Sequence, residues 1–91
     1  MTVDTKFGTF ELIENYKDAF DLIKFEDRYI EEVFDKYEYI VGDVSSEILR
    51  LKGFSNDNNS KNSYKFIKDY LTEFCGINYP YYILKRVNNG L

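Results

Sequence analysis

The chain has no histidine and no tryptophan among its 91 residues, and it has one cysteine, one proline and five scattered glycines. Without histidine, no Ser-His or Cys-His relay can be built, and the commonest metal ligand is missing. The glycines form neither G-x-x-x-x-G-K nor G-x-G-x-x-G, which excludes the usual phosphate-binding loops. The sequence therefore predicts a protein that is not an enzyme and that holds no cofactor.

Long apolar runs are absent as well. No uncharged segment approaches the roughly 18 residues of a membrane helix, and the first residues lack the basic and apolar regions of a signal peptide. Cys75 has no second cysteine for an internal disulfide, so nothing requires an oxidising compartment. We expect a cytoplasmic protein without membrane contact, in which the Cys75 thiol is buried rather than reactive.

Aromatic residues, in contrast, are abundant, with nine Tyr and eight Phe. Each buried ring removes about 150 to 250 Å² from water, so rings can supply much of the core of a small chain. Ninety-one residues are enough for one hydrophobic core. We expect a single α+β domain over residues 1–91, with its core at about 9–87 and with the N-terminal residues and 88–91 loosely ordered.

Periodicity in the first half predicts a strand followed by a helix. Thr9–Asn15 alternates apolar and polar residues, and Gly8 could turn residues 2–6 back as a short extra strand. Apolar residues then recur every three or four positions up to Tyr37, as in an amphipathic helix. We place the helix start near Phe25, with a start at Asp21 as the alternative, because Glu26 then lies near the positive end of the helix dipole.

The second half predicts a hairpin, a helix and a last strand. Residues 39–44 and 47–54 are strand-like runs joined at Ser45-Ser46, and a polar loop leads to a helix that ends at Cys75 before Gly76. Tyr81–Val87 follows Pro80, whose peptide bond with Tyr79 we expect to be trans, with cis as the alternative.

The resulting order is β-α-β-β-α-β. It predicts a four-stranded, mostly antiparallel sheet with both helices on one face. The ferredoxin-like topology is the commonest wiring of this order, and other wirings remain open.

Charge is divided unevenly along the chain, whose net charge is −4. Residues 1–45 hold 12 acidic and 5 basic residues, net −7, whereas residues 46–91 hold 4 and 7, net +3. If the two halves form different faces, the molecule is electrically polar. An acidic total also argues against tight nonspecific binding to the phosphate backbone of nucleic acids.

Eight residues are candidates for contacting a partner. The basic and aromatic candidates lie mainly in the second half, and the acidic ones lie on the first helix: Arg50, Lys52, Phe66, Tyr81, Lys85, Arg86, Glu31 and Asp35. Basic residues interleaved with rings are typical of nucleic-acid surfaces, and a solvated sheet edge is the simpler interpretation. Phe66 points away from the buried helix stripe, so it either packs under a loop or contacts a partner.

A carboxylate pair is the remaining site candidate. Asp43 and Glu47 lie near Ser45 and Ser46, and such oxygen ligands could hold Mg²⁺ or Ca²⁺ weakly. The simpler interpretation makes Asp43 a turn residue and leaves Glu47 in solvent, since Asp and Ser are ordinary turn formers.

Five segments together resemble a known family. They are NYKDAF (15–20), KYEYIVGD (36–43), LRLKGF (49–54), DYLTEFC (69–75) and YYILKR (81–86), and they resemble the YutD-like family of short proteins from Gram-positive bacteria. The resemblance spans about Phe10 to Arg86 and implies a bacterial cytosolic setting without an assigned reaction. This chain departs from the family's aromatic, glycine-rich segment at Val44–Ile48, and it has Tyr79 where members often carry a second cysteine.

These observations lead to two function hypotheses. The first is a small interaction or regulatory module that binds a protein partner, because catalytic residues are missing while rings and opposite charges are abundant. The alternative is RNA or ribosome association through the basic residues Arg50, Lys52, Lys85 and Arg86. A metal or small-molecule site at Asp43 and Glu47 is the third and weakest.

Overall fold

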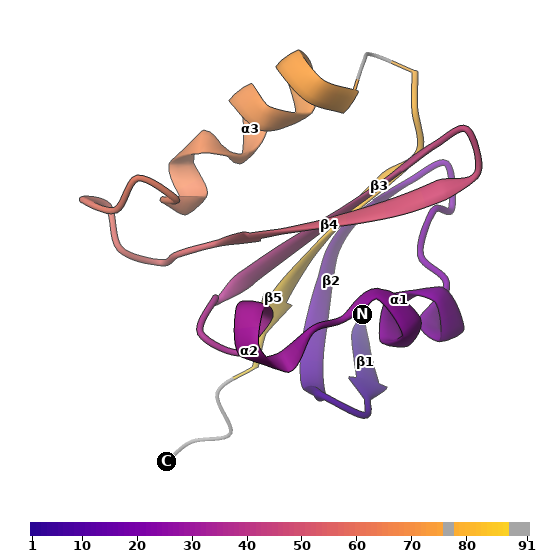
Figure 1. Cartoon of the computed structure of the whole chain (residues 1–91), viewed down its shortest axis with the longest axis horizontal. Helices are drawn as coiled ribbons and strands as arrows, with labels where there is room; N and C mark the ends of the chain where they lie inside the picture. The colour runs from indigo at the N-terminus through magenta and orange to yellow at the C-terminus, as the bar shows by residue number, and fades with distance from the viewer. Residues whose placement is uncertain (76–77, 88–91) are drawn as a thin grey trace.

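Five strands form one antiparallel sheet in the computed structural model, which describes residues 1–75 and 78–87 and, for 74 and 75, the backbone alone. The strands are β1 (Thr2–Thr5), β2 (Gly8–Tyr16), β3 (Tyr39–Ser45), β4 (Ile48–Phe54) and β5 (Tyr81–Arg86). Their order across the sheet is β1-β2-β5-β3-β4 (Figure 1). The α+β class and the antiparallel pairing are confirmed, and the prediction of four strands is wrong. The expectations for Gly76, for the Cys75 thiol and for residues 88–91 lie outside the described residues.

The fifth strand is β1, which the sequence offered only as an alternative. It pairs with β2, so that Val3 lies opposite Phe10. Gly8 has a φ of 121°, a conformation that favours glycine, and it closes the turn after Thr5. The Thr5 hydroxyl donates to the Gly8 carbonyl at 2.8 Å. Residues Thr2–Thr5 are therefore paired in the sheet.

The wiring places β5 in the interior of the sheet, between β2 and β3. Both pairings are antiparallel, so β2 and β3 run parallel to each other with β5 inserted between them, as in a split β-α-β unit. In the ferredoxin-like order the third of the four predicted strands would lie inside the sheet, whereas here that strand, β4, lies at the edge. The ferredoxin-like order is not confirmed.

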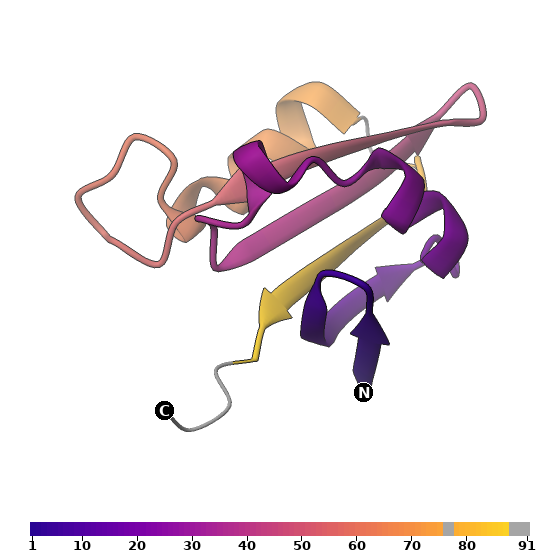
Figure 2. The ribbon, with the colours of Figure 1, turned by 60° about the horizontal axis from the view of Figure 1, so that its bottom comes forward.

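The helical segments lie on opposite faces of the sheet (Figure 2). One face is covered by α1 (Leu22–Arg28) and α2 (Glu31–Phe34), and the other by η1 (Tyr64–Phe66), α3 (Ile67–Tyr70) and η2 (Leu71–Cys75). Ile40 packs with Phe25 in one core cluster, and its neighbour Val41 packs with Ile67 in the other. Successive strand residues point to opposite faces, so the prediction of both helices on one face is wrong. We call the two faces the α1 face and the α3 face.

The first helix differs from the prediction in its start and in its continuity. Asp21 caps α1 by accepting a hydrogen bond from the Lys24 backbone at 3.1 Å, so the later start near Phe25 is wrong. Glu26, which is partly buried next to Phe25, accepts a hydrogen bond from the Lys6 backbone at 2.8 Å. This bond gives the carboxylate the polar partner that a partly buried charge needs. Extended backbone at Tyr29 and Ile30 then separates α1 from α2. None of the helices in the described part of the chain is long and apolar enough to span a membrane.

The hairpin between β3 and β4 is closed by Ser46 and Glu47, one position later than predicted. Both residues have positive φ, 53° and 65°, in a two-residue turn that Asn and Gly prefer. Ser45 belongs to β3 and pairs with Ile48. The peptide bond between residues 79 and 80 is trans, as expected.

Gly42 in β3 makes room for the most deeply buried tyrosine. A Cβ at Gly42 would lie 2.3 Å from Cζ and 2.6 Å from Oη of Tyr82, so no other residue fits there without movement. Tyr82 is fully buried, and among the described residues its hydroxyl has no hydrogen-bond partner. Burial raises the pKa of this phenol, with smaller contributions from the carboxylates of Asp21 and Asp43.

Candidate functional site

Four of the eight candidate residues lie on the α3 face of the sheet. Arg50 in β4 and Tyr81 in β5 are both opposite Asp43 of β3, so the three form one row across the strands. Lys52 lies two residues from Arg50 on the same side of β4, and Lys85 of β5 is four residues from Tyr81. The register therefore brings Arg50, Lys52, Tyr81 and Lys85 onto one face.

A groove of about 340 Å³ runs between β4 and the helical segment on this face. It contains two of the candidates, Lys52 and Phe66, and is lined by Lys52, Phe54, Lys61, Asn62, Phe66, Asp69, Tyr70 and Glu73. The Phe66 ring is 39% exposed, which leaves it available to a partner. We call this groove, together with the adjacent Arg50, the β4 groove.

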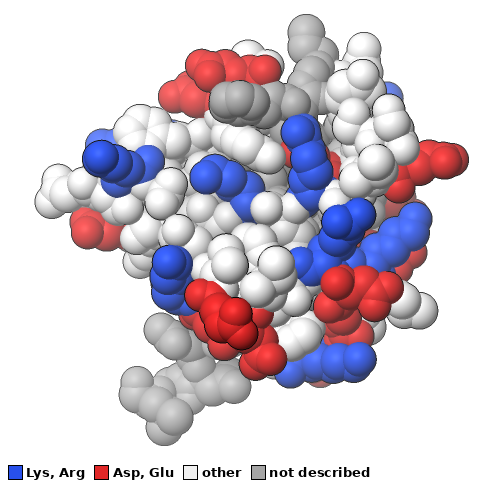
Figure 3. All heavy atoms as spheres, in the orientation of Figure 1, with Lys and Arg blue, Asp and Glu red and all other residues white. Residues whose placement is uncertain are grey.

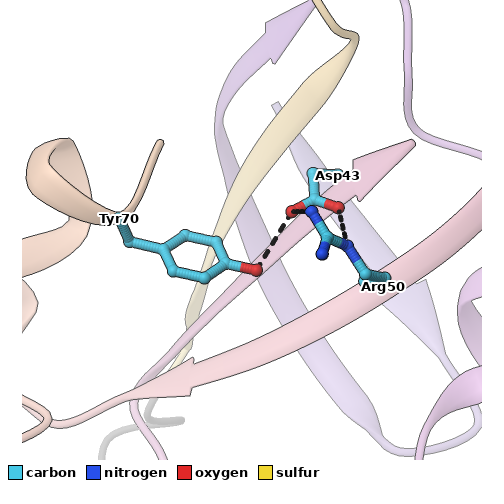
Figure 4. A network of polar contacts seen from close by, with 3 residues as sticks. All are labelled: Asp43, Arg50 and Tyr70. Atoms are coloured by element: carbon cyan, nitrogen blue, oxygen red, sulfur yellow. Dashed lines mark hydrogen bonds and ion pairs between the residues drawn. The ribbon is translucent and has the colours of Figure 1, made fainter. Parts of the chain in front are cut away.

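A buried carboxylate, that of Asp43, binds side chains from β4 and α3 (Figure 4). Asp43 is 1% exposed and accepts hydrogen bonds from Arg50 Nε at 2.9 Å and Nη2 at 3.3 Å. The Tyr70 hydroxyl, from α3, donates to the same carboxylate at 3.0 Å. The Arg50 side chain remains 48% exposed, so the network fixes its position while leaving part of it in contact with solvent.

The candidates on β5 are held by neighbours on the same face. The Tyr81 hydroxyl donates to Glu14, and this hydrogen bond, with a smaller contribution from burial, raises the pKa of Tyr81 to about 12. Its ring stacks on Tyr16 at 5.3 Å between centroids. Lys85 is exposed, with its Nζ 5.7 Å from the centroid of the Tyr39 ring. Neither Tyr81 nor Lys85 lines the β4 groove.

Arg86 points to the α1 face and into the fold. Its guanidinium lies 4.7 Å from the centroid of the Phe10 ring. It donates to four oxygens: the carbonyls of Phe7, Phe34 and Tyr37, at 3.2 Å each, and the hydroxyl of Tyr29 at 2.8 Å. These contacts assign Arg86 to the structure of the core.

The acidic candidates lie apart from the basic ones. Glu31 and Asp35 are exposed at α2, on the α1 face, and Asp35 accepts a hydrogen bond from the Tyr29 hydroxyl at 2.6 Å. Burial and this hydrogen bond raise the pKa of Tyr29, and Arg86 opposes the shift. Figure 3 shows acidic side chains gathered over α2 and basic side chains along the course of β4. The acidic candidates Glu31 and Asp35 and the basic candidates Arg50 and Lys52 thus lie on opposite faces of the sheet.

Asp43 and Glu47 do not form a shared carboxylate site. Asp43 is a buried strand residue bound to Arg50 and Tyr70, and Glu47 is exposed at the hairpin turn. Within residues 1–75 and 78–87, no group of three or more potential metal-binding side chains occurs. The described arrangement therefore offers no support for the weak ion site, which was the weakest of the three hypotheses.

Two features of the surface were missed from the sequence. Tyr70 follows Ile67 by three residues, so its position on the sheet-facing side of the helix was detectable, but its bond to Asp43 was not. The exposed aliphatic residues on the α1 face were assigned to a buried helix stripe. Ile23 is 72% exposed because it lies two residues from buried Phe25, on the opposite side of α1, and Ile30 is 51% exposed in the break between α1 and α2.

Comparisons with known proteins agree with this fold. The chain matches the family described as "Putative antitoxin YutD-like" over residues 4–85. It is 40% identical over 82 residues to "Putative antitoxin YutD" of Bacillus subtilis (strain 168), a match that covers 86% of this chain and 89% of that protein. The solution NMR structure of protein yutD from B. subtilis is similar with a TM-score of 0.78 at 36% identity, covering 97% of this chain and 83% of that chain. The resemblance predicted from the sequence motifs is confirmed, and the chain belongs to the YutD-like family.

Proposed function

We propose that this protein is a small regulatory module that binds a protein partner through the β4 groove. The observation that carries the proposal is the meeting of Lys52 and Phe66 in one open groove, with Arg50 two residues from Lys52 on the same side of β4. Exposed rings and arginine are the residues that most often supply binding energy at the centre of protein interfaces. The proposal assigns no catalysis and keeps the cytoplasmic setting that the sequence predicts.

The network beneath the groove supports a binding role. Asp43 accepts two hydrogen bonds from Arg50 and one from Tyr70, so a partner that contacts Arg50 does not have to order a flexible side chain. Ordering such a side chain costs about 0.5 to 1.5 kcal/mol at an interface, and that cost is reduced when the side chain is already positioned. The groove is thus prepared for binding before the partner arrives.

The relatives' name is compatible with this role. The B. subtilis protein is described as "Putative antitoxin YutD", and an antitoxin neutralises a toxin. Carried to this chain, the description supports a partner whose activity is restrained by the contact. A protein toxin is the partner class that follows from the proposal.

RNA association has less support from the same geometry. Of the four basic residues that the alternative requires, Arg86 points into the core, which leaves three on the surface of the sheet. Lys52 and Lys85 lie on different strands, with β3 between them. Affinity for nucleic acid depends on the number of phosphates neutralised, so this arrangement weakens the case.

The test compares groove variants with matched variants on the opposite face. Tagged wild-type protein would be cross-linked in a Bacillus lysate, and the captured partner would be purified and titrated by calorimetry. Phe66→Ala should weaken its binding about tenfold or more, because a central ring typically contributes at least 1 to 2 kcal/mol. Ile23→Ala, which truncates a side chain that is 72% exposed at α1, should leave the affinity unchanged.

A second pair tests the charge of the groove. Lys52→Glu should weaken binding, and Lys36→Glu, at an exposed residue just after α2, makes the same charge change on the α1 face. Circular dichroism would establish that all four variants are folded. A partner that binds both groove variants as tightly as wild type, or that is lost only on the α1 face, would overturn the proposal.

A further inference from the structure

The outer edge of β4 has backbone groups that no strand in the described part of the chain pairs with. β4 is the last strand in the order, with β3 on its inner side only. The two-residue turn makes Ser45 and Ile48 a hydrogen-bonded pair, and hydrogen-bonded pairs alternate along an antiparallel ladder. The backbone N–H and C=O groups of Leu49, Leu51 and Gly53 therefore point away from β3.

Pockets flank this edge on both faces of the sheet. On the α3 face lies the β4 groove, and on the α1 face a pocket of about 200 Å³ lies between α1 and β4. The second pocket is lined by Lys24, Asp27, Arg28, Glu47 and Leu49. An added strand directs alternate side chains to alternate faces, so its residues would reach the two pockets in turn. In Figure 1, β4 passes between α3 and the helices α1 and α2.

The charges on β4 select among possible occupants. The only charged residues of the strand are Arg50 and Lys52, two residues apart on the α3 face. A second copy paired antiparallel through β4 would bring these like charges opposite one another, which is destabilising at cross-strand distances. Basic residues on an edge strand thus oppose self-association and favour a strand that carries carboxylates at the opposing positions.

We propose that an extended acidic segment of a protein partner adds to the sheet at β4 as a sixth strand. Two acidic residues at positions i and i+2 face Arg50 and Lys52, and the apolar residue between them faces Leu51 on the other side of the strand. The backbone of the segment bonds to the outward groups of Leu49, Leu51 and Gly53. This inference rests on the proposed function and specifies the form of the partner's contact.

The test uses three synthetic peptides with wild-type protein, so no variant has to fold. One peptide alternates Glu and Val, the second alternates Lys and Val, and the third is the Glu-Val peptide with alternate backbone nitrogens methylated. Binding is measured by NMR titration, and amide hydrogen exchange is measured residue by residue. Methylation removes the donors of one strand edge and keeps the side-chain charges, so it separates strand addition from simple charge attraction.

The Glu-Val peptide is expected to bind, with the Lys-Val and methylated peptides at least about tenfold weaker. At a peptide concentration of ten times Kd, exchange of the Leu49, Leu51 and Gly53 amides should slow about tenfold, because only unbound protein exchanges. Equal binding of the methylated peptide, protection at β1 instead, or no binding at about 1 mM would overturn the strand addition. Those results would not affect the proposal that a partner binds through Phe66, because the calorimetric comparison of Phe66→Ala with Ile23→Ala tests that proposal separately.

Discussion

Replacing Tyr82 with Phe is expected to stabilise the protein, although it removes a polar group from the centre of the fold. The Tyr82 side chain is fully buried, and its hydroxyl has no hydrogen-bond partner among the described residues. A buried hydroxyl without a partner costs about 1 to 3 kcal/mol, because its hydrogen bonds to water are lost on folding. Phe has the same ring and avoids this cost.

The expected gain is smaller than the full cost because a void remains. Gly42, which lies against the Tyr82 ring, has no side chain to fill the space of the missing oxygen. A void of roughly 15 Å³ at about 24 cal/mol per Å³ costs about 0.4 kcal/mol. The net increase in the free energy of unfolding should therefore be about 1 to 2 kcal/mol.

Tyr70→Phe provides the matched control, because it removes the same atom from another tyrosine. The Tyr70 hydroxyl donates to Asp43 at 3.0 Å, and the acceptor is a buried carboxylate. Hydrogen bonds to charged groups contribute about 1.5 to 3 kcal/mol, and Tyr70 is only partly buried, so we expect a loss of about 1 to 2 kcal/mol. The two substitutions thus have opposite predicted signs.

Urea unfolding followed by circular dichroism measures both variants. In thermal unfolding of the same variants, a change of 1 kcal/mol in the free energy of unfolding should move Tm by about 4 to 8 °C in a domain of this size. The m-value should stay constant, so that a change in midpoint reports stability alone. If Tyr82→Phe lowered stability by about 1 kcal/mol or more, the hydroxyl would have to be hydrogen-bonded in the folded protein, and the reasoning would be wrong.

Three further predictions concern charge, the turn and pH. Asp43→Asn should lower the free energy of unfolding by about 2 kcal/mol, because a neutral amide is a weaker acceptor than a carboxylate for the Arg50 guanidinium. Unchanged stability in thermal unfolding would contradict this. Ser46→Asn with Glu47→Gly should raise the free energy of unfolding by about 1 kcal/mol, because Asn and Gly adopt positive φ at a lower cost than Ser and Glu. A lower stability on urea unfolding would count against this. Glu14→Gln should lower the pKa of Tyr81 from about 12 towards 10.0 in an absorbance titration. The raised pKa keeps the Tyr81 phenol neutral in the folded protein. The Tyr81–Glu14 hydrogen bond therefore contributes its stability below pH 10, and this contribution is lost as the pH rises towards about 12. A titration identical to wild type would rule out the Glu14 contact.

The elements of the fold were largely predictable, and their arrangement was not. Period-two and period-3.6 patterns identify strands and helices wherever only one side of the element is buried. The adjacent apolar residues Ile40 and Val41 also carried a signal, since a strand covered on both faces has apolar residues in succession. That signal indicates helices on both faces, in contrast to the one-face arrangement predicted from the order of the elements.

Other features depend on contacts between distant segments. Glu26 is satisfied by the backbone of Lys6, which lies 20 residues earlier in the chain. Lys85 and Arg86 had to point to opposite faces, but alternation cannot say which one is buried. The four acceptors around Arg86 come together only in the folded protein. The sequence therefore grouped Arg86 with the basic surface residues, although its side chain points to the α1 face.

The interior position of β5 has a consequence for synthesis of the protein in the cell. The strands that it separates, β2 and β3, share no hydrogen bonds with each other, so the sheet stays in two pieces until residues 81–86 emerge from the ribosome. At about 5 to 20 residues per second, the earlier strands wait for several seconds with their edges open. The nascent chain therefore passes through a vulnerable interval, in which chaperones or proteases can decide how much of the protein matures.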